Sequence, residues 1–314
     1  MQYAFAAVIS FVLVWALIPP IKTWALRIQF VDQPNHRKLH KNPIPLMGGV
    51  AIVIGFFITA FFFAKGSREL DGILLGGTVI FFLGLFDDYG KTRSKELPAW
   101  PKLLVQIGAS AILPAFGVSV QGMNIPFLHP SYVLFPTWLG IASTMIWVIG
   151  ITNMMNFLDG VDGLAAGISA ISATTLFFIA IVKGHPSMAM LAIILVGVSL
   201  GFLRHNFYPA RIFMGDAGAT FLGFILAGIA VEGAFKSAAL VSVAIPVLAL
   251  GVPIMDAFYV IFRRFRENRP IYVADKGHTF HQLMRSGLSQ KQTVTILYLL
   301  GICFSLLSIV LLLS

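Results

Sequence analysis

Residues 137–182 read TWLGIASTMIWVIGITNMMNFLDGVDGLAAGISAISATTLFFIAIV. Two apolar runs within this stretch, 137–154 and 164–182, approach the length of about 20 residues that a helix needs to cross a bilayer. The segment where they meet, residues 153–162, carries four polar side chains: Asn153, Asn156, Asp159 and Asp162. Because polar groups at membrane depth are costly, the stretch predicts two membrane helices joined by a functional loop.

The whole chain repeats this alternation of apolar runs and short polar segments. Of its 314 residues, 58% are hydrophobic and only 11% are charged, and the mean hydropathy is +0.87. A soluble protein would carry a charge at roughly a quarter of its positions. The single cysteine, Cys303, excludes a disulfide framework and a cysteine-rich metal site. We therefore predict an all-α, polytopic integral membrane protein, with residues 1–314 forming one transmembrane domain.

Ten membrane-spanning helices are expected from the apolar runs. Their predicted ranges are 3–25, 46–64, 72–88, 102–118, 137–154, 164–182, 188–204, 216–232, 237–262 and 293–313. Alternate connections hold seventeen and four of the 22 basic residues, which places the basic set in the cytoplasm and both termini outside. Pro246 and Pro253 lie in the ninth range, so that helix is expected to be bent.

The net charge of +9 does not indicate nucleic-acid binding. The basic residues are confined to short connections between spans, which is the pattern that orients membrane proteins. They are not interleaved with aromatic residues, as an RNA-binding surface would require. The predicted partner of the chain is the lipid bilayer, with no nucleic acid.

Polar residues gather in four short motifs at the ends of spans. Each motif belongs to a different cytoplasmic connection: GLFDDYGKTRSK (84–95), NMMNFLDGVDG (153–163), RIFMGDAGATFLG (211–223) and DKGHTFHQLMRSG (275–287). Segments on the same side of a bundle can meet on one face, so the motifs predict a single functional site. A transporter is the alternative class, but its polar residues would lie near the midplane on broken helices.

The first motif contains two adjacent carboxylates, Asp87 and Asp88. Such a pair either binds a cation or splits its pKa values so that one group can act as a base, and a solvated helix end is the plainer alternative. Lys91 and Lys95 follow four residues apart and would share one helical face. Two ammonium groups on one face suit a diphosphate, and a simple membrane anchor is an equal alternative.

The other motifs supply further candidate ligands. On a helix or a tight turn, the four polar side chains of residues 153–162 would form one oxygen-rich stripe. Oxygen ligands suit Mg²⁺ or Mn²⁺ better than zinc, and helix capping is the alternative. Asp216 begins the eighth span, and Asp is favoured as a cap at a helix N-terminus. A metal ligand can occupy the same position, because a helix N-terminus also favours phosphate. Phe213 suits stacking on a base or plain packing, and His278 and His281 suit contacts to phosphate or sugar oxygens. Gly48 and Gly49 would allow helices to approach closely.

Six segments together resemble one family, the polyprenyl-phosphate N-acetylhexosamine-1-phosphate transferases. In chain order they are VDQPNHRKLHKNPIPLMGG (31–49), GLFDDYG (84–90), GITNMMNFLDGVDGLAAG (150–167), NFYPARIFMGDAGATFLG (206–223), GVPIMDAFYVIFRR (251–264) and DKGHTFHQLMRSGLS (275–289). The resemblance implies a multi-pass enzyme of the bacterial cell membrane. It implies Mg²⁺-dependent transfer of a sugar 1-phosphate from a UDP-sugar to a polyprenyl phosphate, with release of UMP.

The resemblance also implies roles for individual residues. Asp216 and Asn156 would hold the metal, and Asp87 would be the base for the lipid phosphate, with Asp88 assisting. The expected substrate contacts are Lys91 and Lys95 to the diphosphate, Phe213 to uracil, Asn153, Asp159 and Asp162 around the nucleotide and metal, and His278, His281 and Arg269 to the sugar phosphate. A homodimer through apolar helix faces is also expected.

Two branches of the family compete for the substrate. The segments DQP, RKLH and DKGH resemble the branch that uses UDP-N-acetylglucosamine, whereas DDYGK is similar to the branch that transfers phospho-N-acetylmuramoyl-pentapeptide. The first branch usually has the run His-x-His-His. Here the run is His278, Thr279, Phe280 and His281, so that Phe280 stands in place of one imidazole.

Overall fold

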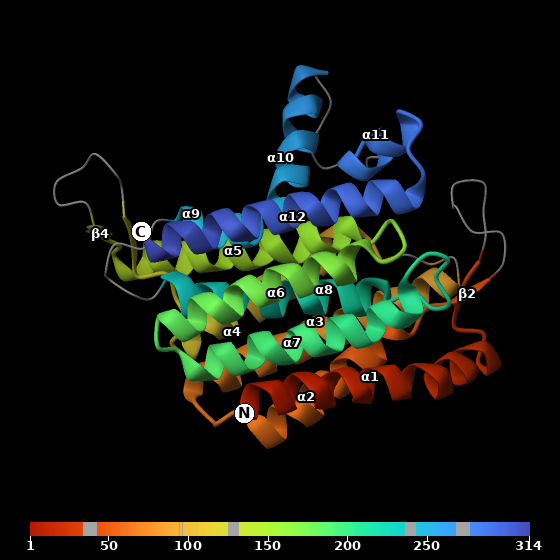
Figure 1. The fold of residues 1–314 in the computed structure, drawn as a ribbon, viewed down its shortest axis with the longest axis horizontal. Coiled ribbons are helices and arrows are strands. Elements are labelled where there is room, and N and C mark those ends of the chain that lie inside the picture. Colours follow the sequence, from red (N-terminus) through yellow and green to blue (C-terminus); the bar gives the residue numbers. More distant parts are fainter. Residues whose placement is uncertain (34–42, 94, 96, 125–131, 236–242, 268–276) are drawn as a thin grey trace.

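The computed structural model describes residues 1–33, 43–93, 95, 97–124, 132–235, 243–267 and 277–314. Most of these residues are helical (Figure 1). The helices are α1 (Gln2–Arg27), α2 (Gly48–Phe63), α3 (Arg68–Thr92), α4 (Ala99–Ala115), α5 (Thr137–Leu158), α6 (Leu164–Val182), α7 (Pro186–Asn206), α8 (Gly215–Ala230), the π-helix η1 (Val231–Phe235), α9 (Ala244–Ala249), α10 (Gly251–Arg266), α11 (Thr279–Arg285) and α12 (Gln290–Leu313). The strands are β1 (Val31–Asp32), β2 (Ile44–Pro45), β3 (Gly122–Asn124) and β4 (Tyr132–Leu134).

Seven helical segments among the described residues are long and apolar enough to cross a membrane. They are α1, α3, α5, α6, α7, α12 and the continuous stretch of α8 and η1 from Gly215 to Gly233. These helices run side by side as one bundle, with the shorter apolar helix α2 beside α1 (Figure 1). The predicted class, a polytopic helical membrane protein, is confirmed. The count of ten spans and the orientation of the termini stay predictions.

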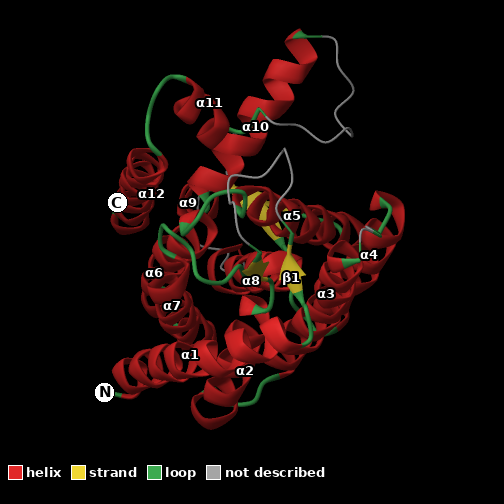
Figure 2. Cartoon of the chain, turned by 90° about the vertical axis from the view of Figure 1, so that its right-hand side faces the viewer, coloured by secondary structure: helices red, strands yellow, loops and turns green. Residues whose placement is uncertain are grey.

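Helix α8 is the central helix of the bundle (Figure 2). Of the residues in its membrane-crossing part, 94% are buried, against 22% in α1 and in α12. Asp216, the charged residue at its start, is therefore placed inside the protein. Small residues let its neighbours approach: a Cβ added at Gly223 would lie 2.9 Å from the Thr152 Cα of α5.

The start of α8 is held by the start of α2. The backbone N–H groups of Gly48 and Gly49 donate to the carbonyls of Phe213 and Met214, at 2.8 and 3.0 Å. A Cβ at Gly49 would lie 2.4 Å from the Gly218 nitrogen, so only glycine permits this contact. The close approach expected at the two glycines is confirmed.

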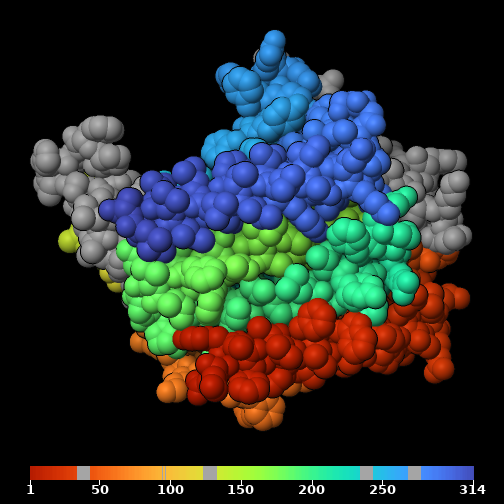
Figure 3. Space-filling model, viewed as in Figure 1, coloured from red at the N-terminus to blue at the C-terminus, as the bar shows by residue number. Residues whose placement is uncertain are grey.

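The bend expected in the ninth span, 237–262, is present in the described part as a break between two helices. Helix α9 ends at Ala249 and α10 begins at Gly251, with Leu250 as the junction. Pro253 lies in the first turn of α10, where its missing N–H has no partner to lose. Helix α10 then projects from the flank of the bundle (Figures 1 and 3). The break therefore redirects the chain and brings the charged residues of α10 beside α11.

Two short antiparallel strand pairs complete the described fold. Strand β1 pairs with β2, with Val31 opposite Pro45, and β3 pairs with β4, with Met123 opposite Val133. The first pair lies at the end of the bundle where α8 begins, and the Pro45 carbonyl accepts from the Phe213 N–H at 2.8 Å. This pair therefore helps to position the segment that leads into α8.

Candidate active site

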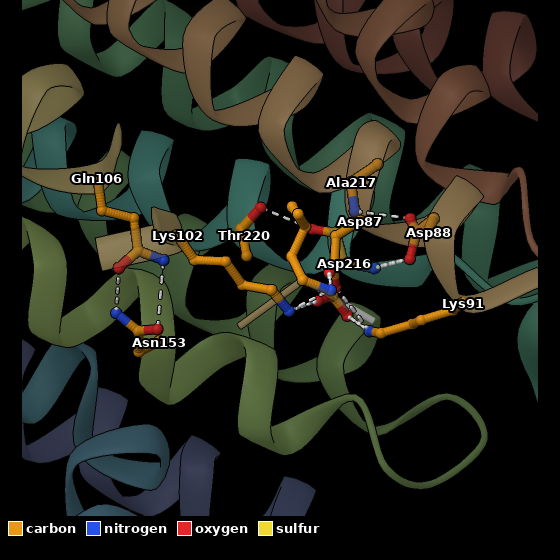
Figure 4. A network of polar contacts seen from close by, with 10 residues as sticks. Asp87, Asp88, Lys91, Lys102, Gln106, Asn153, Asp216, Ala217 and Thr220 are labelled. Atoms are coloured by element: carbon orange, nitrogen blue, oxygen red, sulfur yellow. Dashed lines mark hydrogen bonds and ion pairs between the residues drawn. The ribbon is translucent and has the colours of Figure 1, made fainter. Parts of the chain in front are cut away.

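Four charged side chains from three helices form one network at this end of the bundle (Figure 4). The Lys102 Nζ of α4 lies 2.6 Å from Asp87 Oδ2 of α3 and 3.7 Å from Asp216 Oδ2 of α8. The Lys91 Nζ lies 3.3 Å from Asp87 Oδ2 and also binds Asp216 Oδ1. Asp87 is 1% exposed, and Asp216 is 16% exposed. The alternation of charges allows two carboxylates to stay close together where the membrane helices meet.

Asp88 caps the N-terminus of α8 from the neighbouring helix α3. Its Oδ1 accepts from the Asp216 N–H at 2.9 Å and its Oδ2 accepts from the Ala217 N–H at 3.0 Å. Gly215 has a φ of +69°, and a Cβ there would lie 2.3 Å from the Asp88 carboxylate. Both oxygens of Asp88 thus satisfy helix N–H groups that have no partner within α8. The geometry gives Asp88 the task of holding Asp216 in place.

Asp159 lies beside this network because α5 and α8 are antiparallel. Gly223 of α8 contacts Thr152 of α5, and Asp159 is seven residues after Thr152 while Asp216 is seven before Gly223. Burial raises the pKa of the Asp159 carboxyl well above its usual range, and the charges of Asp216 and Asp88 raise it further. The loop after α5 therefore adds a fourth acidic group to the site.

The loop 159–163 is fixed by polar contacts with other segments. Asp162 Oδ2 accepts from the Ala210 N–H at 2.9 Å, and Asn206 Oδ1 accepts from the Gly163 N–H at 2.9 Å. The Tyr298 hydroxyl of α12 donates to the Gly163 carbonyl at 2.5 Å. One carboxylate oxygen of Asp162 is therefore bonded to the segment that leads into α8, and three hydrogen bonds to other segments hold the loop.

The four polar residues from Asn153 to Asp162, expected on a helix or a tight turn, are divided between a helix and the turn that follows it. Helix α5 ends at Leu158, so Asp159 and Asp162 lie in the following turn. Asn153 Nδ2 donates to Gln106 Oε1 at 2.8 Å, and Gln106 Nε2 donates to Asn153 Oδ1 at 3.3 Å (Figure 4). This reciprocal amide pair joins α5 to α4 beside the charged network. Asn156 stays on the last turn of α5, next to the loop.

The expected placement of Lys91 and Lys95 on one helical face is wrong. Helix α3 ends at Thr92, and Lys95 is exposed beyond that end. The second ammonium group of the network comes from Lys102, which sequence reasoning counted only as a basic residue of a cytoplasmic connection. No local sequence signal separates Lys102 from the other basic residues of these connections.

The histidine motif reaches the site through Phe280. His278 Nδ1 lies 2.7 Å from Asp256 Oδ2 of α10, and the Phe280 ring stacks parallel on His278, with the ring centroids 5.7 Å apart. A Cβ at Gly160 would lie 2.6 Å from Phe280 Cζ, so this ring packs on the acidic loop. His281 contacts the same ring, with centroids 4.3 Å apart. Phe280 therefore fills a packing position between the second and fourth motifs.

Two other predicted residues complete the comparison with the sequence. Phe213 is partly buried against the hydrophobic core, and its backbone joins β2 to α8. Arg269 lies outside the described residues. The stacking of Phe213 on a base stays a prediction.

The donor set fits a hard divalent cation that arrives with a phosphate. Among the residues that the structure describes, no group of three or more His, Cys, Asp or Glu side chains is arranged to hold a metal ion. Asp87 and Asp216 bind lysine ammonium groups instead. However, Mg²⁺ commonly binds through one or two carboxylates together with substrate phosphates and water, and needs no cage of protein ligands. Asp216, whose side chain is 16% exposed, supplies carboxylate oxygens that suit this mode.

The fold and this site define an integral membrane protein with a charged, oxygen-rich centre where several membrane helices end. The model of glycosyl transferase family 4 matches residues 70–234, which is more than half of the chain. The chain is 38% identical to a probable undecaprenyl-phosphate N-acetylglucosaminyl 1-phosphate transferase of Bacillus subtilis, over 98% of this chain and 84% of that protein. The chain therefore belongs to glycosyl transferase family 4, and it is a transferase.

The names of less similar relatives also specify a polyprenyl phosphate. A decaprenyl-phosphate N-acetylglucosaminephosphotransferase of Mycobacterium tuberculosis is 33% identical over 89% of this chain and 75% of its own length. An undecaprenyl-phosphate alpha-N-acetylglucosaminyl 1-phosphate transferase of Escherichia coli is 27% identical over 88% of this chain and 74% of its own length. The resemblance inferred from the six sequence segments is confirmed.

Proposed function

We propose that the protein transfers N-acetylglucosamine 1-phosphate from UDP-N-acetylglucosamine to undecaprenyl phosphate, at the cytoplasmic face of the plasma membrane. The products are undecaprenyl-diphosphate-N-acetylglucosamine and UMP, and the product lipid would start a cell-surface glycopolymer. The observation that carries this proposal is the network of Asp87, Lys91, Lys102 and Asp216 at the meeting point of α3, α4 and α8. The names of the relatives support the choice of sugar and lipid.

The chemistry requires two polyanions to approach each other. An oxygen of the lipid phosphate forms a bond to the sugar-bearing phosphorus, the phosphoanhydride bond breaks, and UMP leaves with the bonding electrons. Catalysis of such a transfer rests on positioning and charge stabilisation. Lys91 and Lys102 would supply positive charge to the phosphates, by exchanging a carboxylate partner for a phosphate oxygen. Asp87 would orient the two lysines, because it binds both.

A dedicated base contributes less here than in many transfers. A phosphate monoester has a second pKa near 6 and is largely ionised at pH 7. Asp87 already accepts from Lys102 at 2.6 Å and from the Leu97 N–H at 3.1 Å. We therefore assign Asp87 a role in placing the lipid phosphate rather than in removing its proton. Asp88 would act through the position of Asp216.

Asp216 and Asn156 would hold Mg²⁺, or Mn²⁺ in its place. The metal, when bound, supplies positive charge that offsets the charge of the diphosphate. The remaining contacts follow from the predicted roles: Phe213 with uracil, Asn153, Asp159 and Asp162 around the nucleotide, Lys95 near the diphosphate, and His278, His281 and Arg269 with the sugar phosphate. A homodimer through apolar helix faces remains part of the proposal.

The test uses purified protein in detergent with Mg²⁺ and undecaprenyl phosphate. UDP-N-acetylglucosamine and UDP-N-acetylmuramoyl-pentapeptide are offered separately, and UMP release and the lipid product are measured. Turnover of the first substrate alone is expected. Turnover of the second alone would place the protein in peptidoglycan synthesis, and turnover of neither by folded protein would contradict the proposal and favour a transporter.

The matched pair of variants is Asp216→Asn and Asp71→Asn. Asp71 is exposed in the first turn of α3, at the end of the bundle opposite to Asp87. Asp216→Asn is expected to lower kcat by about 10²-fold or more, because it removes a charge that the reaction centre requires. Asp71→Asn is expected to leave kcat unchanged. Equal rates for the two variants would refute the role of Asp216.

A further inference from the structure

One imidazole outside the lysine–aspartate network is bonded to a buried carboxylate. His278 Nδ1 lies 2.7 Å from Asp256 Oδ2, and the two residues are 9% and 2% exposed. Asp256 is on α10 and His278 precedes α11, so the contact joins two elements that lie 22 positions apart in the chain. A buried carboxylate needs such a donor, because an unpartnered charge away from water is costly.

The same imidazole is in contact with two aromatic rings. The Phe280 ring is parallel to it within 5°, with centroids 5.7 Å apart, and the Phe157 ring of α5 is tilted by 37°, with centroids 5.5 Å apart. Phe280 is 2% exposed and packs on Gly160 of the acidic loop. The rings restrict rotation of the imidazole about its Cβ–Cγ bond, and they place it beside the loop that carries Asp159.

Helix α10 also holds the backbone around His278. Asp256 Oδ1 accepts from the Thr279 N–H at 2.6 Å, and Arg263 Nη1 donates to the Gly277 carbonyl at 3.2 Å. Asp256 and Arg263 are seven residues apart and therefore lie on the same face of α10, two turns from each other. The turn that carries His278 is thus tied to α10 at the residue before and at the residue after the imidazole.

The bond to Asp256 decides which nitrogen is left for a ligand. A carboxylate accepts hydrogen bonds and has no proton to donate when ionised, so Nδ1 carries the proton. Nε2 is then the ring nitrogen available to a substrate, and it donates when the ring is protonated. A protonated imidazole that donates to a phosphate oxygen makes a charge-assisted hydrogen bond, which is about twice as strong as a neutral one.

We propose that Asp256 is a positioning residue, which acts through His278 by fixing its Nδ1–H and aiming Nε2–H at a diphosphate oxygen of the sugar nucleotide. The inference rests on the proposed function and adds a residue and a direction to it. Asp256 lies in the segment GVPIMDAFYVIFRR, far from the acidic motifs in sequence, and the break before α10 is what brings it to His278. Phe280 completes the arrangement by stacking, and not by contacting the sugar.

The test is a double-mutant cycle with Asp256→Asn and His278→Gln. Asp256→Asn is expected to lower kcat for UDP-N-acetylglucosamine by about 10²-fold, the size of a general acid–base contribution. The KM for the sugar nucleotide is expected to change by less than about threefold, because the contact strengthens as charge develops on the leaving phosphate. The double variant is expected to be no slower than His278→Gln alone, since Asp256 acts only through that ring.

Control variants separate this role from simple support of the turn. Arg263→Gln removes another tie between α10 and the same turn but leaves the Asp256–His278 bond in place, so its kcat is expected to fall by less than about fivefold. Asp256→Glu keeps a carboxylate and is expected to recover part of the rate. Losses that multiply in the double variant, or an equal loss in Arg263→Gln, would overturn the proposal. If Asp256→Asn does not fold, Asp256→Ser takes its place in the cycle.

A spectroscopic measurement tests the dyad without turnover. In histidine-selective ¹⁵N-labelled protein in detergent, the His278 Nδ1–H is expected to give a far-downfield proton resonance that is lost in His278→Gln and shifted upfield in Asp256→Asn. A wild-type protein that shows this resonance but no turnover would contradict the proposed function and keep the dyad. Absence of the resonance in an active wild-type protein would overturn the inference alone.

Discussion

Lys102 lies 15 residues from Asp87 in the chain and 2.6 Å from it in space. In the sequence it is one of many basic residues in cytoplasmic connections, and nothing distinguishes it from a membrane anchor. In the fold it is the second ammonium group beside two carboxylates, the place that Lys95 was expected to take. The difference comes from the end of α3 at Thr92, which leaves Lys95 exposed.

Lys102→Met is expected to lower kcat/KM for UDP-N-acetylglucosamine by about 10²-fold, because one of the two ammonium groups near the phosphates is removed. The matched control is Lys65→Met, an exposed lysine between α2 and α3 at the opposite end of the bundle. Steady-state kinetics of the two variants measure the difference. A Lys102→Met enzyme as fast as Lys65→Met would remove Lys102 from the site.

Contacts between helices at small residues set the geometry of the charged network. Helix α3 approaches the start of α8 at Gly84, where an added Cβ would lie 2.5 Å from the Ala217 Cα. The next turn of α3 carries Asp87 and Asp88, so a displacement of this contact moves both carboxylates relative to Asp216. The apolar pattern predicted these helices, but it does not say which faces meet, since their hydrophobic residues cover nearly the whole surface of each helix.

Gly84→Ala is expected to destabilise the protein by about 1–3 kcal/mol, because backbone atoms of α8 must move to admit the methyl group. Its kcat should fall with it. In Gly108→Ala, on α4, the added methyl group meets no atom within 4 Å, and the better helix propensity of alanine should leave stability unchanged or slightly higher. Thermal unfolding in detergent compares the two, and an equal shift in Tm for both would show that the close approach at Gly84 is unimportant.

The whole molecule gathers the polar motifs at one end of a bundle whose exposed surface is mainly apolar. The acidic loop after α5, the end of α3, the starts of α4 and α8 and the turn before α11 all contribute to this end (Figure 1). The bias of basic residues predicts that this end faces the cytoplasm. The lipid substrate would reach it from the bilayer that surrounds the bundle.

Cysteine labelling tests this orientation in intact cells. In a Cys303→Ser background, Lys65→Cys is expected to react with a membrane-impermeant maleimide from outside, whereas Arg93→Cys should react only after the membrane is opened. Both positions are exposed, so access across the membrane decides the result. The reverse pattern would invert the predicted topology, and with it the cytoplasmic location of the site.

Composition and apolar run lengths were sufficient to predict a polytopic helical membrane protein, because crossing a bilayer requires about 20 consecutive apolar residues and satisfied backbone hydrogen bonds. Motif order was sufficient for the family. The division of the ninth span was only partly predictable: Pro246 and Pro253 indicate a bend, but the direction of α10 depends on its packing against α5 and α12.

The sequence by itself determined the class of the fold, the family, and the acidic and histidine motifs of the candidate site, since each of these is written in local composition or in short, ordered segments. Only the tertiary structure decided the partners. In the fold, Asp87 binds Lys102 and Asp88 caps α8. Asn153 is hydrogen-bonded to Gln106, and Asp256 is bonded to His278. The physical reason is that such contacts depend on where each helix ends and on how closely glycine lets backbones approach, and both are settled by packing.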